Sequence, residues 1–196
     1  GRQYLVGAKS EWTSKNGKSL PLQTKAYYIN DEKVLYHRKH DKVDFLESSE
    51  VNFNKKTPVL SREIEFLNDA KELKLYLPLP PKSLAFKGFT SEEKKEGQVQ
   101  TIVYSAAIGS FTHQLVLPKG VNSSDVQLFR DEKTLQVRVE IKNITAGQKI
   151  KTLTWLGGDT ATQKAFTYLC KRSLQQSIKG GAQRFKKAIV LQGTTN

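Results

Sequence analysis

The sequence contains very little sulfur and no long apolar run. Its 196 residues include no methionine and a single cysteine, Cys170. One cysteine excludes an internal disulfide framework and slightly favours a reducing compartment. No segment approaches the roughly 18 consecutive apolar residues that a membrane-spanning helix needs, and residues 1–7 lack the apolar core of a secretory signal. We therefore expect a cytoplasmic protein or one held within an assembly, and the absence of methionine favours a processed chain.

Acidic residues are scarce at one end of the chain. The whole sequence has 32 Lys and Arg against 19 Asp and Glu, a formal net charge of +13. Residues 61–148 hold 12 basic and 11 acidic side chains, whereas residues 149–196 hold nine basic side chains and one acid, Asp159. Because 37% of the residues are hydrophobic, a chain of this length can bury a core. The sequence predicts a nearly neutral globular middle joined to a cationic C-terminal quarter.

The clearest pattern is an alternation of apolar and polar residues between positions 110 and 142. A first run ends at Pro118, which cannot donate to a strand ladder, and further runs continue to Lys142. One face collects the apolar side chains Phe111, Leu115, Leu117, Val126, Leu128, Leu135, Val137, Val139 and Ile141. The opposite face is polar and charged, which is typical of an antiparallel sheet with one packed and one wet face. The predicted fold class is mainly β, an antiparallel sandwich of immunoglobulin-like or jelly-roll-like type.

Shorter alternating runs predict strands elsewhere in the chain. The charged residues 91–97 are expected to be a solvated loop, and the polar residues 54–57 before Pro58 are the best candidate for a boundary. The expected organisation is a β-rich segment 1–57, a sandwich core 58–156 and a basic segment 157–196.

The basic segment begins with a signal for a helix. Asp159 or Thr160 can cap the first turn, apolar residues then recur at helical spacing, and Gly180-Gly181 ends the run. Cys170 falls on the apolar face, where cysteine behaves as a small hydrophobe. The sequence Gly157-Gly158-Asp159-Thr160 can hold a phosphate on free amides, but without a Walker lysine simple capping is preferred.

Several segments of the middle third carry a family resemblance. They are Phe111, Leu117-Pro118-Lys119-Gly120-Val121, Val126-Gln127-Leu128 and residues 135–142, preceded by residues 73–78 and 84–86. In this order they resemble the α-crystallin domain of the small heat-shock proteins and, more loosely, the CS domains of co-chaperones.

The resemblance implies an immunoglobulin-like sandwich without a cofactor, which binds partners through sheet edges and a groove. By position, the interaction groove would be lined by Leu84, Phe86, Val126 and Leu128. The tripeptide Ile189-Val190-Leu191 would match the short C-terminal anchor of that family, with Ile189 and Leu191 as the anchoring side chains.

No constellation in the sequence predicts catalysis. His37 and His40, three residues apart beside Asp41, have a spacing that suits a metal on a helix, but they fall in a strand-and-turn region among cations, so a solvated turn is preferred. His113 lies in an alternating strand and is expected to have a hydrogen-bond partner in the sheet. Cys170 has no evident base beside it. The sequence therefore predicts no enzyme, no metal site and no cofactor.

The composition of the basic segment predicts a polyanionic partner. Its cations, interleaved with three aromatic residues, are Lys164, Lys171, Arg172, Lys179, Arg184, Lys186 and Lys187. Cations bind a phosphate backbone favourably because counterions are released, and eight net charges in 48 residues repel one another unless a polyanion neutralises them. The alternative is an amphipathic helix that packs on the sandwich with a basic wet face; anionic lipid headgroups come third.

The expected function is that of a non-enzymatic interaction or structural protein whose C-terminal segment contacts nucleic acid, as in a virion or ribonucleoprotein. Binding would be mainly electrostatic, because no motif for base recognition is present. The alternative is an ATP-independent chaperone-like module that captures clients through its groove and edge strand. In either case we expect protein partners at sheet edges and a homo-oligomer.

Overall fold

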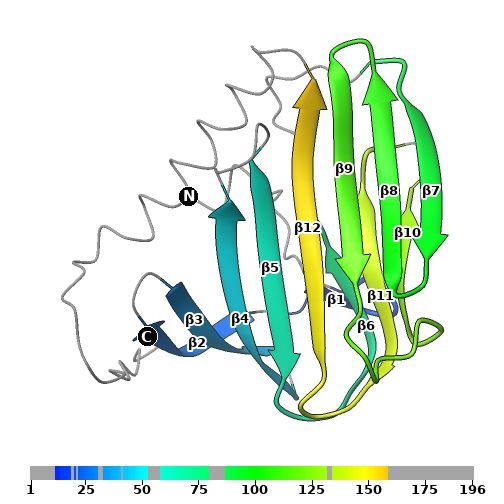
Figure 1. Cartoon of the computed structure of the whole chain (residues 1–196). Helices are drawn as coiled ribbons and strands as arrows, with labels where there is room; N and C mark the ends of the chain where they lie inside the picture. Colours follow the sequence, from blue (N-terminus) through cyan, green and yellow to red (C-terminus); the bar gives the residue numbers. More distant parts are fainter. Residues whose placement is uncertain are drawn as a thin grey trace.

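The computed structural model describes residues 12–18, 20, 22–30, 33–40, 42–52, 58–79, 87–131 and 134–158, and in this part the protein is built from antiparallel strands (Figure 1). The strands are β1 (Trp12–Ser14), β2 (Leu22–Asn30), β3 (Lys33–His40), β4 (Val43–Asn52), β5 (Val59–Phe66), β6 (Ala70–Tyr76), β7 (Thr90–Glu96), β8 (Val99–Ala106), β9 (Gly109–Val116), β10 (Val126–Arg130), β11 (Val137–Ile144) and β12 (Lys149–Gly158). The prediction of a mainly β fold is confirmed. The predicted C-terminal helix lies outside the described residues.

The strands form two sheets that pack face to face. One has four strands in the order β1-β6-β11-β10, and the other has eight in the order β2-β3-β4-β5-β12-β9-β8-β7. The boundary expected near Pro58 falls between β4 and β5, which pair from Phe45 opposite Phe66 to Asn52 opposite Val59. β2, β3 and β4 therefore extend the eight-stranded sheet, whereas β1 belongs to the four-stranded one.

The core lies between the two sheets and follows from the alternation in the sequence. Alternate residues of β5, β9, the second half of β6 and the first half of β11 point inward, and Ile64, Leu75, Leu115 and Val139 are fully buried. In β6 the alternation shifts at Glu72, so that Ala70 and Leu73 are both buried. Trp12 on β1 packs against Phe45 of the other sheet, with ring centroids 5.0 Å apart. Apolar side chains that alternate at period two can be buried together only where a second layer covers that face, which is what the four-stranded sheet provides.

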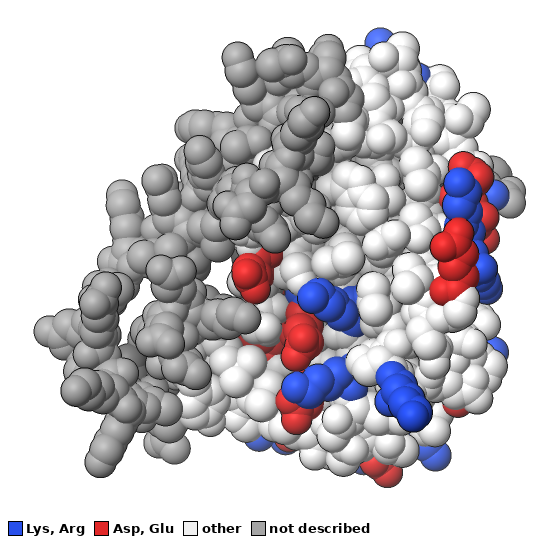
Figure 2. All heavy atoms as spheres, in the orientation of Figure 1, with Lys and Arg blue, Asp and Glu red and all other residues white. Residues whose placement is uncertain are grey.

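Residues 91–97 were predicted to be a solvated loop, and this was wrong. Residues 90–96 form β7, which pairs with β8 at the edge of the larger sheet. Its side chains are charged on both faces and nearly all exposed, so the sequence shows no alternation. Charges of both signs follow this edge of the molecule in Figure 2. Such charges protect an edge strand from pairing with other chains.

The outer face of the eight-stranded sheet carries balanced charges at its lower end, where acidic and basic side chains are interspersed (Figure 2). Lys149 on β12 lies 3.0 Å from Glu65 and 3.4 Å from Glu63 on β5. The hydrogen bond and charge of Glu65 raise the pKa of Lys149 above its ordinary value. Because the charges in this part of the face are paired, it does not form a broad positive patch.

Candidate anion-binding cleft

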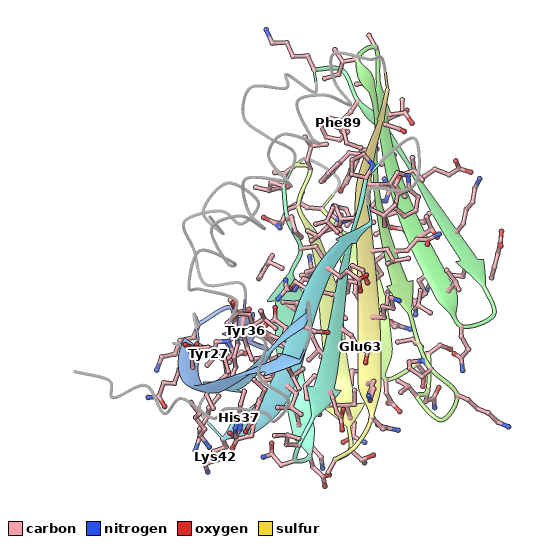
Figure 3. The ribbon with its side chains drawn as sticks, turned by 60° about the vertical axis from the view of Figure 1, so that its left-hand side comes forward. Tyr27, Tyr36, His37, Lys42, Glu63 and Phe89 are labelled. Atoms are coloured by element: carbon pink, nitrogen blue, oxygen red, sulfur yellow. The ribbon has the colours of Figure 1, made fainter. Side chains whose placement is uncertain are left out.

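A cleft of about 470 Å³ opens at one end of the sandwich. It lies between the residues that follow β1, the β3–β4 turn and the start of β6, and we call it the basic cleft. Its lining includes Ser14, Lys15, Asn16, His40, Lys42, Lys71 and Glu72. Lys42 and the neighbouring His37 are at the end of the molecule opposite Phe89 (Figure 3).

Strand pairing and one side chain bring these segments together. β1 pairs with β6 so that Ser14 lies opposite Leu73. Asn68, in the β5–β6 turn, donates from Nδ2 to the carbonyl oxygen of Lys42 at 2.6 Å and accepts the amide of Asp44 at 2.7 Å. The β3–β4 turn is therefore fixed against the β5–β6 turn, and this fixes one wall of the cleft.

The basic cleft has an excess of positive charge. Lys15 forms an ion pair with Glu72 at 2.9 Å, and Asp69 accepts a hydrogen bond from the amide of Ala146 at 3.0 Å. Lys42 and Lys71 are exposed, and neither has an ion-pair partner in the described part of the chain. The three lysines and two acids of the lining thus sum to a net charge of +1, which favours an anion in the cleft.

Glu72 has an unusual backbone conformation. Its φ of 57° is the only positive φ at a non-glycine residue among the described residues. A non-glycine residue in the left-handed region costs about 1–2 kcal/mol, and such strain concentrates at functional sites. The conformation is held from both sides, because Lys71 and Leu73 keep their register opposite Asn143 and Ile141 of β11.

The histidine pair does not form a metal site. His37 and His40 lie in β3, where an odd separation places them on opposite faces of the sheet. His40 is 1% exposed and stacks on Phe45, so the expectation of a solvated turn was wrong for it. Asp41 lies outside the described residues. Within the described ranges, no three His, Cys, Asp or Glu side chains are grouped to hold a metal ion.

Cations surround the acid that follows the β3–β4 turn. Asp44 Oδ1 lies 2.7 Å from Lys25 Nζ and 3.1 Å from His37 Nε2. Partial burial acts to raise its pKa, but the hydrogen bonds from Lys25 and His37 and the charges of Lys25 and Lys39 outweigh burial and hold the pKa below its ordinary value. Asp44 therefore stays ionised, and its charge is balanced by Lys25 and the other cations around it.

A second ionic group is buried on the inner face of the large sheet. Glu47 on β4 lies between Arg62 of β5 and Arg38 of β3, and all three side chains are at most 6% exposed. The guanidinium of Arg38 also lies 4.8 Å from the ring centroid of Tyr36. Among the described residues, this buried ionic group consists of two arginines and one glutamate.

The predicted groove is only partly within the described residues. Val126 and Leu128 are 0% and 4% exposed and face the core between the sheets. Leu84, Phe86 and the anchor residues Ile189 and Leu191 lie outside the described ranges. So do the seven predicted nucleic-acid-binding cations, Lys164, Lys171, Arg172, Lys179, Arg184, Lys186 and Lys187.

The outward edge of β10 is closed by a side chain from the other sheet. Gln100 on β8 is buried; its Nε2 donates to the carbonyl oxygen of Val126 at 3.1 Å, and its Oε1 accepts the amide of Leu128 at 2.9 Å. Arg130 on β10 also bonds to Ser91 and Glu93 of β7. An added strand would have to displace these contacts, so β10 is a poor site for strand addition.

His113 on β9 is fully buried in the sheet. Its Nδ1 lies 3.0 Å from Thr154 Oγ1 on the adjacent strand β12, which confirms the expected hydrogen-bond partner. Complete burial lowers the pKa of His113 to about 3. A neutral histidine enclosed in this way serves the packing of the sheet.

Comparison with known proteins adds no relative: no protein-family model matches the chain, and no curated protein matches it. The resemblance to the α-crystallin domain therefore stays a prediction. Within the described residues, no helix has the length and apolar character needed to cross a membrane.

No local pattern in the sequence indicates the basic cleft. Its lysines Lys15, Lys42 and Lys71 are scattered over 57 positions and come together only through the pairing of β1 with β6 and the Asn68 contacts. Gly17, in the turn that follows β1, has a φ of 75°, which glycine adopts without strain.

Proposed function

We propose that the chain is a non-enzymatic β-sandwich interaction protein whose basic C-terminal segment contacts nucleic acid. It would act as a structural component of a virion or ribonucleoprotein. The observation that carries this proposal is the segregation of charge: residues 149–196 have a net charge of +8, and residues 61–148 have +1. A polyanion relieves the repulsion among those cations, and released counterions favour binding.

The proposal includes the finer architecture and the assembly. The sandwich would be immunoglobulin-like or jelly-roll-like, with a basic C-terminal helix, and the chain would associate with itself or with protein partners. Since the β10 edge is closed by Gln100 and β7 is charged, the edges that remain for a partner strand are the three-residue β1 and the longer β2, neither of which has a strand on its far side among the described residues.

Neutralising the C-terminal segment tests the proposal in the full chain. One variant changes Lys171, Arg172, Lys179, Arg184, Lys186 and Lys187 to Gln. A matched control changes Lys74, Lys87, Lys94, Lys95, Lys119 and Lys142 to Gln, which removes the same charge from the sandwich. With a fluorescent single-stranded oligonucleotide, the first variant should lose about 100-fold in affinity or more, and the control should lose much less. Equal losses would contradict a role for the segment.

The chaperone-like alternative makes the opposite prediction about salt. It requires suppression of client aggregation that persists at high salt and oligomers that need Ile189 and Leu191. If no oligonucleotide binds and Ile189→Ser with Leu191→Ser abolishes suppression of aggregation, the alternative replaces the proposed function.

A further inference from the structure

We propose that the basic cleft binds a phosphate group. Three lysines approach the same concave site from three separate segments: Lys15 after β1, Lys42 in the β3–β4 turn and Lys71 at the start of β6. Lysine is a compact point charge with three donors, and it is a common ligand of phosphate. A tetrahedral anion with several oxygens suits donors that converge from different directions.

The charges of the cleft favour an anion over a cation. The two acids at its rim are engaged, Glu72 by Lys15 and Asp69 by the amide of Ala146. Lys42 and Lys71 have no ion pair in the described ranges, and the hydroxyl of Ser14 and the amide of Asn16 add hydrogen-bonding groups to the lining. With three lysines against two acids, an entering phosphate would therefore meet a lining of net charge +1, in which Lys42 and Lys71 form no ion pair in the described ranges.

Glu72 is placed to regulate access to the third lysine. Its ion pair with Lys15 is solvent-exposed, with the two side chains 48% and 69% exposed, so a stronger anion can replace the carboxylate at little cost. The left-handed backbone at Glu72 is a second, independent mark of a functional position. When phosphate binds, Lys15 thus breaks its ion pair with Glu72 and pairs with the phosphate instead.

The source of the phosphate is either a free or small phosphorylated molecule or the backbone of a nucleic acid, and the second case rests on the proposed function. The binding of a phosphate group, which the two sources share, is tested first. In the full chain, amide chemical shifts of Asn16 and Lys71 are followed while inorganic phosphate is added at constant ionic strength, with acetate as the comparison anion. The shifts should saturate with phosphate and respond weakly to acetate.

Variants decide whether the basic cleft is the place where phosphate binds. Lys42→Gln with Lys71→Gln should weaken phosphate binding about tenfold, because two charge-assisted contacts are lost. The matched control, Lys87→Gln with Lys95→Gln, removes the same charge at β7 and just before it and should change binding less than about twofold. Glu72→Gln should strengthen binding about threefold by freeing Lys15. No saturable shift, equal losses in both double variants, or weaker binding by Glu72→Gln would overturn the site.

An oligonucleotide separates the two sources. If the cleft holds a backbone phosphate, Lys42→Gln with Lys71→Gln should reduce the salt slope of single-strand binding by about 1–2. Saturable phosphate binding with an unchanged slope overturns the nucleic-acid source and supports a small phosphorylated ligand. If phosphate binds but no oligonucleotide binds to any form of the chain, the proposed function is wrong. The assignment of the basic cleft as a phosphate site is then still supported.

Discussion

Arg62 donates to a single carboxylate oxygen of Glu47, from Nε at 3.1 Å and from Nη2 at 2.9 Å. Both side chains are buried on the inner face of neighbouring strands, and Arg38 lies 3.1 Å from the other oxygen of the carboxylate. Burying charges is costly, and removing one member of a buried pair leaves the others uncompensated. This contact joins β3, β4 and β5 and so ties the N-terminal strands to the sandwich.

Glu47→Gln should therefore destabilise the chain strongly. Two buried guanidinium groups would lose their counter-charge, and a loss of about 3–5 kcal/mol is expected. The measurement is the free energy of unfolding in urea. Glu63→Gln on the adjacent strand, at an exposed position, serves as the control and should change stability by less than about 0.5 kcal/mol. Similar values for the two variants would contradict the assigned role of Glu47.

Gln100→Ala should open the edge of β10. The amide of Leu128 and the carbonyl of Val126 would both lose a partner while buried, which costs about 1–3 kcal/mol for each group. Hydrogen exchange at the Leu128 amide should accelerate along with the loss of stability. Gln114→Ala, which removes a half-buried glutamine bonded only to Thr101 Oγ1 among the described residues, should leave that amide protected. Unchanged exchange at Leu128 in Gln100→Ala would show that the edge is closed by other means.

His113 should make stability fall in acid. Its pKa in the folded chain, about 3, lies below the ordinary 6.5. Between these two pH values the unfolded chain therefore binds a proton that the folded chain does not bind. The stabilising contribution is complete above pH 6.5 and is lost as the pH falls toward 3. The slope is about 1.4 kcal/mol per pH unit in that window. Measured between pH 4 and 6, the unfolding free energy of His113→Asn should have a slope smaller by this amount. Identical slopes would contradict the assignment.

Glu72→Gly should not destabilise the chain, although glycine within a strand normally does. Glycine adopts a positive φ without penalty, and this gain offsets its greater freedom in the unfolded state. Unfolding in urea should show a change between zero and about 1 kcal/mol in the stabilising direction. Lys74→Gly, two positions further along β6, should lose about 1 kcal/mol. A loss at Glu72 as large as that at Lys74 would mean that its backbone is not strained.

Much of the fold could be predicted from alternation alone. The strands around Phe111, Leu115, Val137 and Val139 were predicted because one face is apolar and the other polar. β7 was missed because a strand with charges on both faces has no period to detect. His40 was expected in water because its neighbours in the sequence are charged, whereas its strand neighbour Lys39 points to the other face of the sheet.

The site could be predicted much less well. A cleft built from Lys15, Lys42 and Lys71 depends on long-range pairing, which local patterns do not encode. Buried charges such as Arg38, Glu47 and Arg62 look in the sequence like ordinary surface residues, because nothing local shows that their strands carry them inward together. The cationic C-terminal segment, by contrast, is visible in the composition and is the basis of the proposed function.

The most direct test of that function is the affinity of the full chain for single-stranded and duplex oligonucleotides across a series of salt concentrations. If the basic segment contacts the phosphate backbone, log affinity should fall linearly with log salt, with a slope of several ions. The variant with six neutralised C-terminal cations should have a much shallower slope. For the single-stranded and the duplex oligonucleotide alike, the affinity should depend only weakly on the nucleotide sequence. If neither oligonucleotide binds even at low salt, or if affinity is insensitive to salt, the nucleic-acid account is wrong.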